Sequence, residues 1–245
     1  MIKLLQATLL GLFLGAFGTT LGGIIGITFK STSKKFLSFI LALASGLMMS
    51  IVCFDLIPEA LELSNIFNTL FGISFGISVM IFCNVYVEKK IKKKSKNVLN
   101  TMLKTGIIVS LGLAIHNFPE GLAIGSGMDV SLKLGMNLAI AICLLDIPEG
   151  ISMAVPMKAG GMSKTKIIIY VILSGVTTGI GAFCGAVVGK ISKEIIGICL
   201  SFAGGAMLYI VSGELTPEAN NLYRGKMTAI GNILGIILGI LATIN

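Results

Sequence analysis

Two short motifs place acidic side chains, an amide and the only histidine of the chain inside apolar stretches. His116–Gly121 has the sequence HNFPEG, and Asp146–Gly150 has the sequence DIPEG. Residues three or four positions apart project from one side of a helix, so each motif predicts a face of ligand side chains. Imidazole with carboxylate suits zinc, iron(II) or manganese better than calcium, which prefers oxygen ligands only. The candidate metal ligands are His116, Asn117, Glu120, Asp146 and Glu149.

Crowded carboxylates in an apolar environment need an explanation. Ionisable groups in hydrocarbon are costly, so they tend to face a cavity and serve a function. Three carboxylates at one point would repel one another, and a divalent ion would offset that repulsion. Cys143, one turn before Asp146, is a further candidate soft ligand. The structural alternative is that these carboxyl groups only stabilise two bent helices and that His116 hydrogen-bonds a neighbour.

Each motif also contains a helix-distorting pair of residues. A proline inside a helix removes an amide donor and kinks the helix. A following glycine would ease the same distortion. We therefore expect helix kinks at Pro119, Gly121, Pro148 and Gly150.

Composition identifies the class of protein that carries these motifs. The 245 residues are 55% hydrophobic and only 12% charged, and mean hydropathy is +0.97, whereas globular domains average roughly 25% charged residues. The apolar residues fall in runs near the ~20 residues that span a bilayer. An all-α, polytopic membrane protein is therefore predicted, with the lipid bilayer as a partner.

The basic charge and the cysteines are both compatible with a membrane protein. The net charge is +8, but its densest run, Lys89–Lys96, lies between apolar spans without interleaved aromatic residues. Such a run is typical of a topology signal, and nucleic-acid binding is not expected. All five cysteines lie in apolar segments and form no CxxC pair. We interpret them as small hydrophobic residues.

Eight transmembrane helices are predicted in one transporter domain, residues 1–245. A lysine-rich cytosolic loop is expected at about 89–101. The helices fall into three groups, about 4–88, 102–157 and 167–244. Their predicted ranges are 4–29, 36–63, 69–88, 102–126, 132–157, 167–189, 195–219 and 227–244.

Lysine placement predicts the orientation. With the N-terminus outside, fifteen of the 19 basic residues lie in inward loops, as the positive-inside rule requires. Both termini are then extracytoplasmic, and we expect the chain in the plasma membrane. The inward residues are Lys30, Lys34, Lys35, Lys89, Lys90, Lys92, Lys93, Lys94, Lys96, Lys104, Lys158, Lys164, Lys166, Arg224 and Lys226.

An internal repeat relates the two ends of the chain. Residues 44–60, ASGLMMSIVCFDLIPEA, match residues 203–219, AGGAMLYIVSGELTPEA, without gaps at an offset of 159. The predicted helices that carry them cross the membrane in opposite directions. Inverted repeats are common in secondary transporters, whose substrate site lies between the repeats near the midplane. A 3+2+3 arrangement follows, with the two motif helices in the centre.

Acidic residues on the repeated helices suggest an ion path. Two stripes are spaced as one helix face, and an acidic mouth would concentrate cations. The alternative is that the methionines are packing residues and the acids are interfacial. The candidate entrance is Met48, Asp55, Glu59 and Glu62, and the candidate exit is Met207, Glu214 and Glu218.

In these motifs and over its whole length, the sequence resembles the ZIP family of zinc- and iron-type metal transporters. The HNFPEG motif is the family's most specific one, and DIPEG is similar to its partner. The resemblance implies eight helices, a binuclear-type site between the fourth and fifth, and ion entry into the cytosol by elevator-like movement of one bundle. It implies His116, Asn117, Glu120, Asp146 and Glu149 as ligands.

Two positions depart from the family pattern. Leu145 stands where a histidine, glutamine or asparagine is frequent, and Thr178 stands where a glutamate is frequent. The sequence therefore leaves open whether one or two metal positions exist.

The predicted function is divalent transition-metal transport by alternating access, without enzymatic activity. Zinc, iron, manganese or cadmium would be the substrate, and no cofactor is expected. The chain lacks a Walker motif and an HExxH motif, which disfavours a pump and a zinc protease. An intramembrane metal-dependent enzyme and a metal sensor are the alternatives. The metal preferred, proton coupling and a homodimer, which glycine-rich helix faces would allow, stay open.

Overall fold

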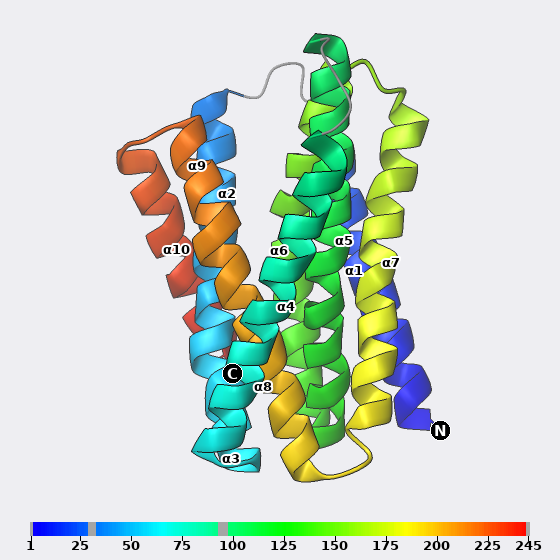
Figure 1. Ribbon diagram of the computed structural model, residues 1–245, viewed down its shortest axis with the longest axis vertical. Helices are drawn as coiled ribbons and strands as arrows, with labels where there is room; N and C mark the ends of the chain where they lie inside the picture. Colours follow the sequence, from blue (N-terminus) through cyan, green and yellow to red (C-terminus); the bar gives the residue numbers. More distant parts are fainter. Residues whose placement is uncertain (1, 29–32, 93–97, 244–245) are drawn as a thin grey trace.

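A computed structural model describes residues 2–28, 33–92 and 98–243 (Figure 1). The all-α class is confirmed. Two long helices are each divided by a π-helical segment, as α2 (Lys34–Ile51), η1 (Val52–Leu56) and α3 (Ile57–Leu63), and as α8 (Lys193–Ile210), η2 (Val211–Leu215) and α9 (Thr216–Leu222). The others are α1 (Ile2–Thr28), α4 (Ile66–Lys92), α5 (Val98–Val130), α6 (Leu132–Ala159), α7 (Lys164–Val188) and α10 (Lys226–Thr243).

Six helices in the described part of the chain are long and apolar enough to cross a membrane, and Lys226–Leu241 is a shorter apolar helix. The predicted total of eight spans stays a prediction. Several helices exceed their predicted ranges: α4 extends to Lys92, and α5 begins at Val98. Of the predicted loop 89–101, only residues 93–97 separate these helices, and they lie outside the described residues.

The helices form two groups that differ in their packing partners. In one group, α1, α5, α6 and α7 pack against one another. In the other, α2 packs along α10, and α4 packs along α8. Contacts of α5 with α8, and of α6 with α2, join the groups. We call them the central bundle (α1, α5, α6, α7) and the flanking bundle (α2, η1, α3, α4, α8, η2, α9, α10), and Figure 1 shows them side by side.

The repeat extends through secondary structure. Both divided helices change to π-helix for five residues at positions 159 apart, Val52–Leu56 and Val211–Leu215. A proline follows each segment by two residues, and its missing amide donor removes one α-helical hydrogen bond. Figure 1 shows that α2 to α3 and α8 to α9 run in opposite directions. The two copies are therefore antiparallel.

Close helix contacts repeat with the same offset. A Cβ atom on Gly46 would lie 2.0 Å from the Asn232 carbonyl oxygen, and one on Gly205 would lie 2.2 Å from that of Ile73. Gly205 follows Gly46 by 159 residues, and Asn232 follows Ile73 by 159 residues. Helices approach this closely only where a residue lacks a side chain. The repeat thus relates the packing of α2 on α10 to the packing of α8 on α4.

Apolar and charged side chains are distributed as in a protein that lies in lipid. Large apolar side chains on α4 are exposed, including Phe67 at 79% and Phe82 at 72%. In contrast, Glu120, Asp146 and Glu149 are completely buried. Such a surface would be unfavourable in water, whereas in hydrocarbon it is favourable.

Candidate metal centre

Three carboxylates from the two central motifs meet inside the central bundle. Glu120 comes from α5, and Asp146 and Glu149 come from α6, which packs against it. One oxygen of each carboxylate lies within 4.8 Å of one oxygen of both others. We call these three residues the carboxylate triad. The i, i+3 spacing in the DIPEG motif places two of its members on one helix face.

The triad is desolvated and unpaired. All three residues are 0% exposed, and none of their six carboxylate oxygens has a hydrogen-bond partner among the described residues. A buried polar group without a partner costs about 1–3 kcal/mol, and a charged one costs more. A divalent cation would bind these oxygens and neutralise their mutual repulsion. The arrangement is therefore suited to holding a metal ion.

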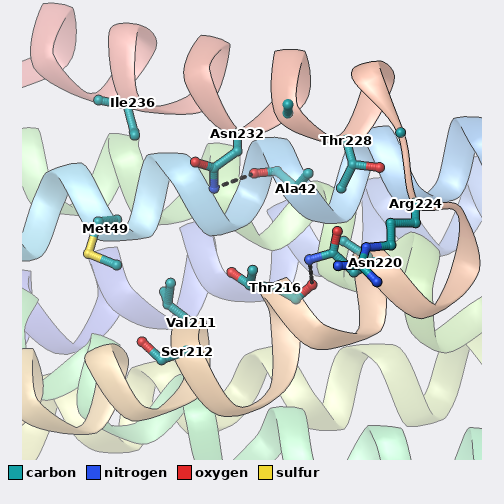
Figure 2. A pocket seen from close by; sticks show the side chains of 13 residues that line it. Ala42, Met49, Val211, Ser212, Thr216, Asn220, Arg224, Thr228, Asn232 and Ile236 are labelled. Carbon is teal, nitrogen blue, oxygen red and sulfur yellow. Dashed lines mark hydrogen bonds between the residues drawn. The ribbon is translucent and has the colours of Figure 1, made fainter.

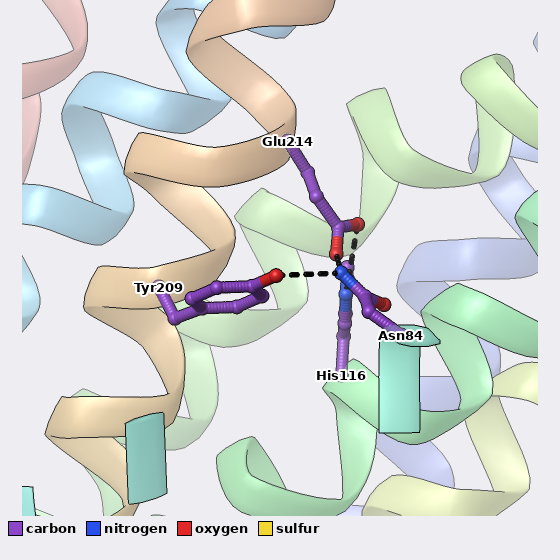
Figure 3. A network of polar contacts seen from close by, with 4 residues as sticks. All are labelled: Asn84, His116, Tyr209 and Glu214. Atoms are coloured by element: carbon purple, nitrogen blue, oxygen red, sulfur yellow. Dashed lines mark hydrogen bonds and ion pairs between the residues drawn. The ribbon is translucent and has the colours of Figure 1, made fainter. Parts of the chain in front are cut away.

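His116 lies beside the triad and is paired with the flanking bundle. Its Nε2 atom is 3.1 Å from Oε2 of Glu214 in η2. The other oxygen of Glu214 accepts a hydrogen bond from Nδ2 of Asn84, which lies 3.3 Å from the Tyr209 hydroxyl (Figure 3). Glu149 interacts electrostatically with both His116 and Glu214. The site thus continues from the triad across the bundle interface.

Asn117 is held by α7. Its Nδ2 atom donates to the carbonyl of Ser174 at 3.0 Å and lies 3.4 Å from the Ser174 hydroxyl. Its Oδ1 atom is buried and has no hydrogen-bond partner among the described residues. The amide oxygen is therefore the atom of Asn117 that would coordinate a cation.

The glycines of the two motifs lie at close helix crossings, and the prolines lie within continuous helices. Helices α5 and α6 continue through Pro119 and Pro148 without a break. A Cβ atom on Gly121 would lie 1.9 Å from the Thr178 carbonyl oxygen, and one on Gly150 would lie 2.1 Å from that of Thr19. Both glycines therefore permit a close helix crossing. The expected kinks themselves stay a prediction.

A comparison with protein families identifies the chain. The family model described as ZIP zinc transporter matches residues 86–244, which include both motifs. The chain belongs to the ZIP family. With its apolar helices, this membership makes it an integral membrane protein.

Several ZIP relatives are named zinc transporters. The zinc transporter ZupT of Clostridium perfringens is 40% identical over 56% of this chain and 49% of its own length. The zinc transporter GufA of Myxococcus xanthus is 32% identical over 57% of this chain and 56% of its own length. The chain thus spans about half the length of these two relatives. The zinc transporter ZupT of Oceanobacillus iheyensis is 30% identical over 97% of both chains.

The two departures from the ZIP pattern have different surroundings. Leu145 is 0% exposed and belongs to the main apolar cluster, which also contains Ile142 and Met207. Thr178 is also fully buried, and its hydroxyl has no hydrogen-bond partner among the described residues. Leu145 directly precedes the DIPEG motif, at the position that corresponds to His116 in the HNFPEG motif, so an imidazole is present on only one of the two central helices.

The candidate path residues lie in different environments. Met48 and Met207 are buried in the same apolar cluster, at 0% and 1% exposure. Asp55 and Glu59 are partly exposed, and Glu62 and Glu218 are exposed. Glu214 lies against a motif residue, His116. Among the described residues Cys143 is buried but lies outside the group of closely spaced ligand atoms.

Asn84, Tyr209 and Ser174 were not predicted as site residues. Asn84 offered a signal, since an amide in the middle of an apolar helix usually has a polar partner. Tyr209 and Ser174 offered none, because their contacts join helices distant in sequence.

Proposed function

We propose that this chain transports divalent transition-metal ions toward the cytosol by alternating access around the carboxylate triad. Zinc is the first candidate, and iron, manganese and cadmium are the others. The observation that carries the proposal is the complete burial of Glu120, Asp146 and Glu149 with oxygens within 4.8 Å. The ion is the substrate, and no resident cofactor is proposed.

The ligand chemistry supports a transition metal. Carboxylate oxygens alone would suit calcium, but His116 adds an imidazole beside the triad, and imidazole favours zinc, iron and similar metals. Asn117 adds a buried oxygen without a partner among the described residues. In this proposal the triad holds the ion, and His116 and Glu214 carry it across the interface between the bundles.

The packing supports movement of one bundle against the other. The triad belongs to the central bundle, whereas Glu214 belongs to the flanking bundle. A sliding of one bundle would move the triad relative to Glu214, so the ion would meet different ligands on the two sides of the membrane. Antiparallel repeats are common in transporters that alternate in this way.

The membrane arrangement proposed is eight spans in the order 3+2+3. Lysine-rich segments would face the cytosol, and both termini would be extracytoplasmic. We place the protein in the plasma membrane, and a homodimer stays open. A metal-dependent intramembrane enzyme and a metal sensor are the alternative functions.

Uptake of zinc into proteoliposomes tests the proposal. We expect wild-type protein to load vesicles that contain a zinc-sensitive dye, and Glu120→Ala and Glu149→Ala to abolish loading. Glu194→Gln is a matched control, because this exposed carboxylate lies at the start of α8. A sensor would bind zinc without flux. Unchanged flux in both triad variants, confirmed as folded by their melting temperatures, refutes transport through this site.

A further inference from the structure

A groove on the flanking bundle is separate from the metal centre. It has a volume of about 680 Å³ and lies between α2, α10 and the stretch from η2 to the loop after α9 (Figure 2). Its lining includes Ser212 and Thr216, each two residues from Glu214. Because residues two positions apart lie on roughly opposite sides of a helix, Ser212 and Thr216 project away from the contact between Glu214 and His116.

The groove is polar at one end and apolar at the other. Figure 2 shows Arg224 and Asn220 at one end and Met49 and Ile236 at the other. Arg224 lies between α9 and α10, where the chain turns back. Met49 lies in the last turn of α2 before η1, well inside the predicted span. The lining thus changes from charged to hydrophobic between a helix end and membrane depth.

The polar end has a single full charge. Arg224 is the only arginine of the chain, and the lining residues that the structure describes include no acidic side chain. The Asn220 amide donates to the Thr216 carbonyl at 3.0 Å, and the Thr216 hydroxyl lies 2.7 Å from that of Ser45. These contacts fix the wall of the groove. The guanidinium of Arg224 is the group that would bind an anion.

Packing of the repeat does not require this polar lining. Ser212, Thr216 and Asn220 follow one another at intervals of four residues, and so form one stripe. The corresponding residues 159 positions earlier are Cys53, Ile57 and Leu61. The corresponding stripe in the first copy is therefore apolar, and its Cys53 and Leu61 are exposed. A ligand that contacts only the second copy would explain the difference.

We propose that this groove binds an anionic glycerophospholipid. Its headgroup phosphate would pair with Arg224, and an acyl chain would lie along Met49, Val211 and Ile236. A guanidinium can bind two phosphate oxygens at once, and basic residues at a membrane surface attract anionic lipids. A free phosphate ion would use only the polar end, whereas a lipid matches the whole length. The proposal does not depend on metal transport.

Native mass spectrometry of the full chain tests this binding. Protein in detergent would be titrated with phosphatidylglycerol, with phosphatidylcholine, or with inorganic phosphate. We expect a one-to-one phosphatidylglycerol adduct that Arg224→Gln weakens about tenfold or more, the size of one lost charged contact. Ala229→Phe, which fills the groove without changing charge, should weaken it similarly. Lys164→Gln, an exposed cation at the start of α7, is the matched control.

The controls separate the sources of the phosphate group. Equal retention of phosphatidylcholine and phosphatidylglycerol, or a phosphatidylglycerol adduct unchanged by both groove variants, overturns the proposal. Binding of inorganic phosphate that excludes phosphatidylglycerol also overturns it. Melting temperatures within the wild-type range show that a lost adduct does not result from unfolding.

Discussion

The Nε2 atom of His116 lies 3.1 Å from a carboxylate oxygen of Glu214, and this contact joins the central and flanking bundles. The residues are 98 positions apart, in a HNFPEG motif and in a π-helical segment respectively. Of the candidate path residues, Glu214 is the one placed against the metal centre. π-Helical segments are frequent at functional sites, and here the segment presents a carboxylate to the site.

Replacement of Glu214 is predicted to slow transport without removing the primary binding site. We expect Glu214→Gln to lower zinc flux about ten- to 150-fold, since a charge-assisted contact contributes roughly 1.5–3 kcal/mol and every 1.4 kcal/mol corresponds to tenfold. Zinc affinity of the detergent-solubilised protein should change little, because the triad is intact. Glu194→Gln, an exposed carboxylate at the start of α8 that is not a candidate path residue, is the control. Equal losses in both variants would show that the His116 contact has no special role.

Addition of a methyl group at either motif glycine is predicted to destabilise the fold. By helix propensity alone, alanine would be about 1 kcal/mol better than glycine. At Gly121 the new Cβ would lie 1.9 Å from the Thr178 carbonyl oxygen, and overpacking costs about 1–3 kcal/mol or more. We therefore expect Gly121→Ala and Gly150→Ala to lower the melting temperature.

Gly204→Ala is the control for these substitutions. Gly204 is buried in α8, but its Cβ would meet Val52 Cγ1 at 3.5 Å, an ordinary contact. The melting temperature should stay constant or rise. If all three variants behave alike, close backbone approach is not what the motif glycines provide.

Periodicity within single helices predicted much of the candidate site. The i, i+3 spacing in DIPEG predicted that Asp146 and Glu149 share one helix face, and the cost of burying charge predicted that Glu120 lies near them, as the structure places it. The gapless offset of 159 predicted which helices correspond. These features depend only on local helix geometry and on the cost of burying charge. Both are properties of the sequence itself.

Contacts between distant helices could not be predicted in the same way. The pairing of His116 with Glu214, and the role of Asn84 beside it, depend on how two bundles dock. The π-helical segments depend on whether the backbone before Pro58 and Pro217 forms α-helical or π-helical hydrogen bonds. The pattern of apolar residues does not distinguish these two conformations. Helix α4 also ends later, at Lys92, and α5 begins earlier, at Val98, than the sequence predicted. Lysine favours a helix, so both helices can continue beyond the bilayer.

Removal of bound metal is predicted to lower the stability of the protein. Asp146 is predicted to contribute to this stabilisation as a metal ligand. Zinc should raise the melting temperature of the wild type, and a chelator should reverse the rise, because a ligand that binds only the folded state stabilises it. In Asp146→Asn a tenfold weaker site would reduce this rise by about 3–6 °C. Differential scanning fluorimetry with and without zinc measures it. The Glu194→Gln variant should show the full shift, and a full shift in Asp146→Asn would remove this residue from the ligand set.

Leucine substitutions at Met48 and Met207 distinguish packing from a thioether ion path. Both methionines are almost completely buried in one apolar cluster. Leucine conserves their volume and costs under about 1.5 kcal/mol in most cores, whereas it cannot coordinate a metal. Since the structure places both side chains among apolar neighbours, we expect Met48→Leu and Met207→Leu to retain at least half of the wild-type zinc flux in proteoliposomes. Loss of flux at an unchanged melting temperature would instead assign the two sulfur atoms to the path of the ion.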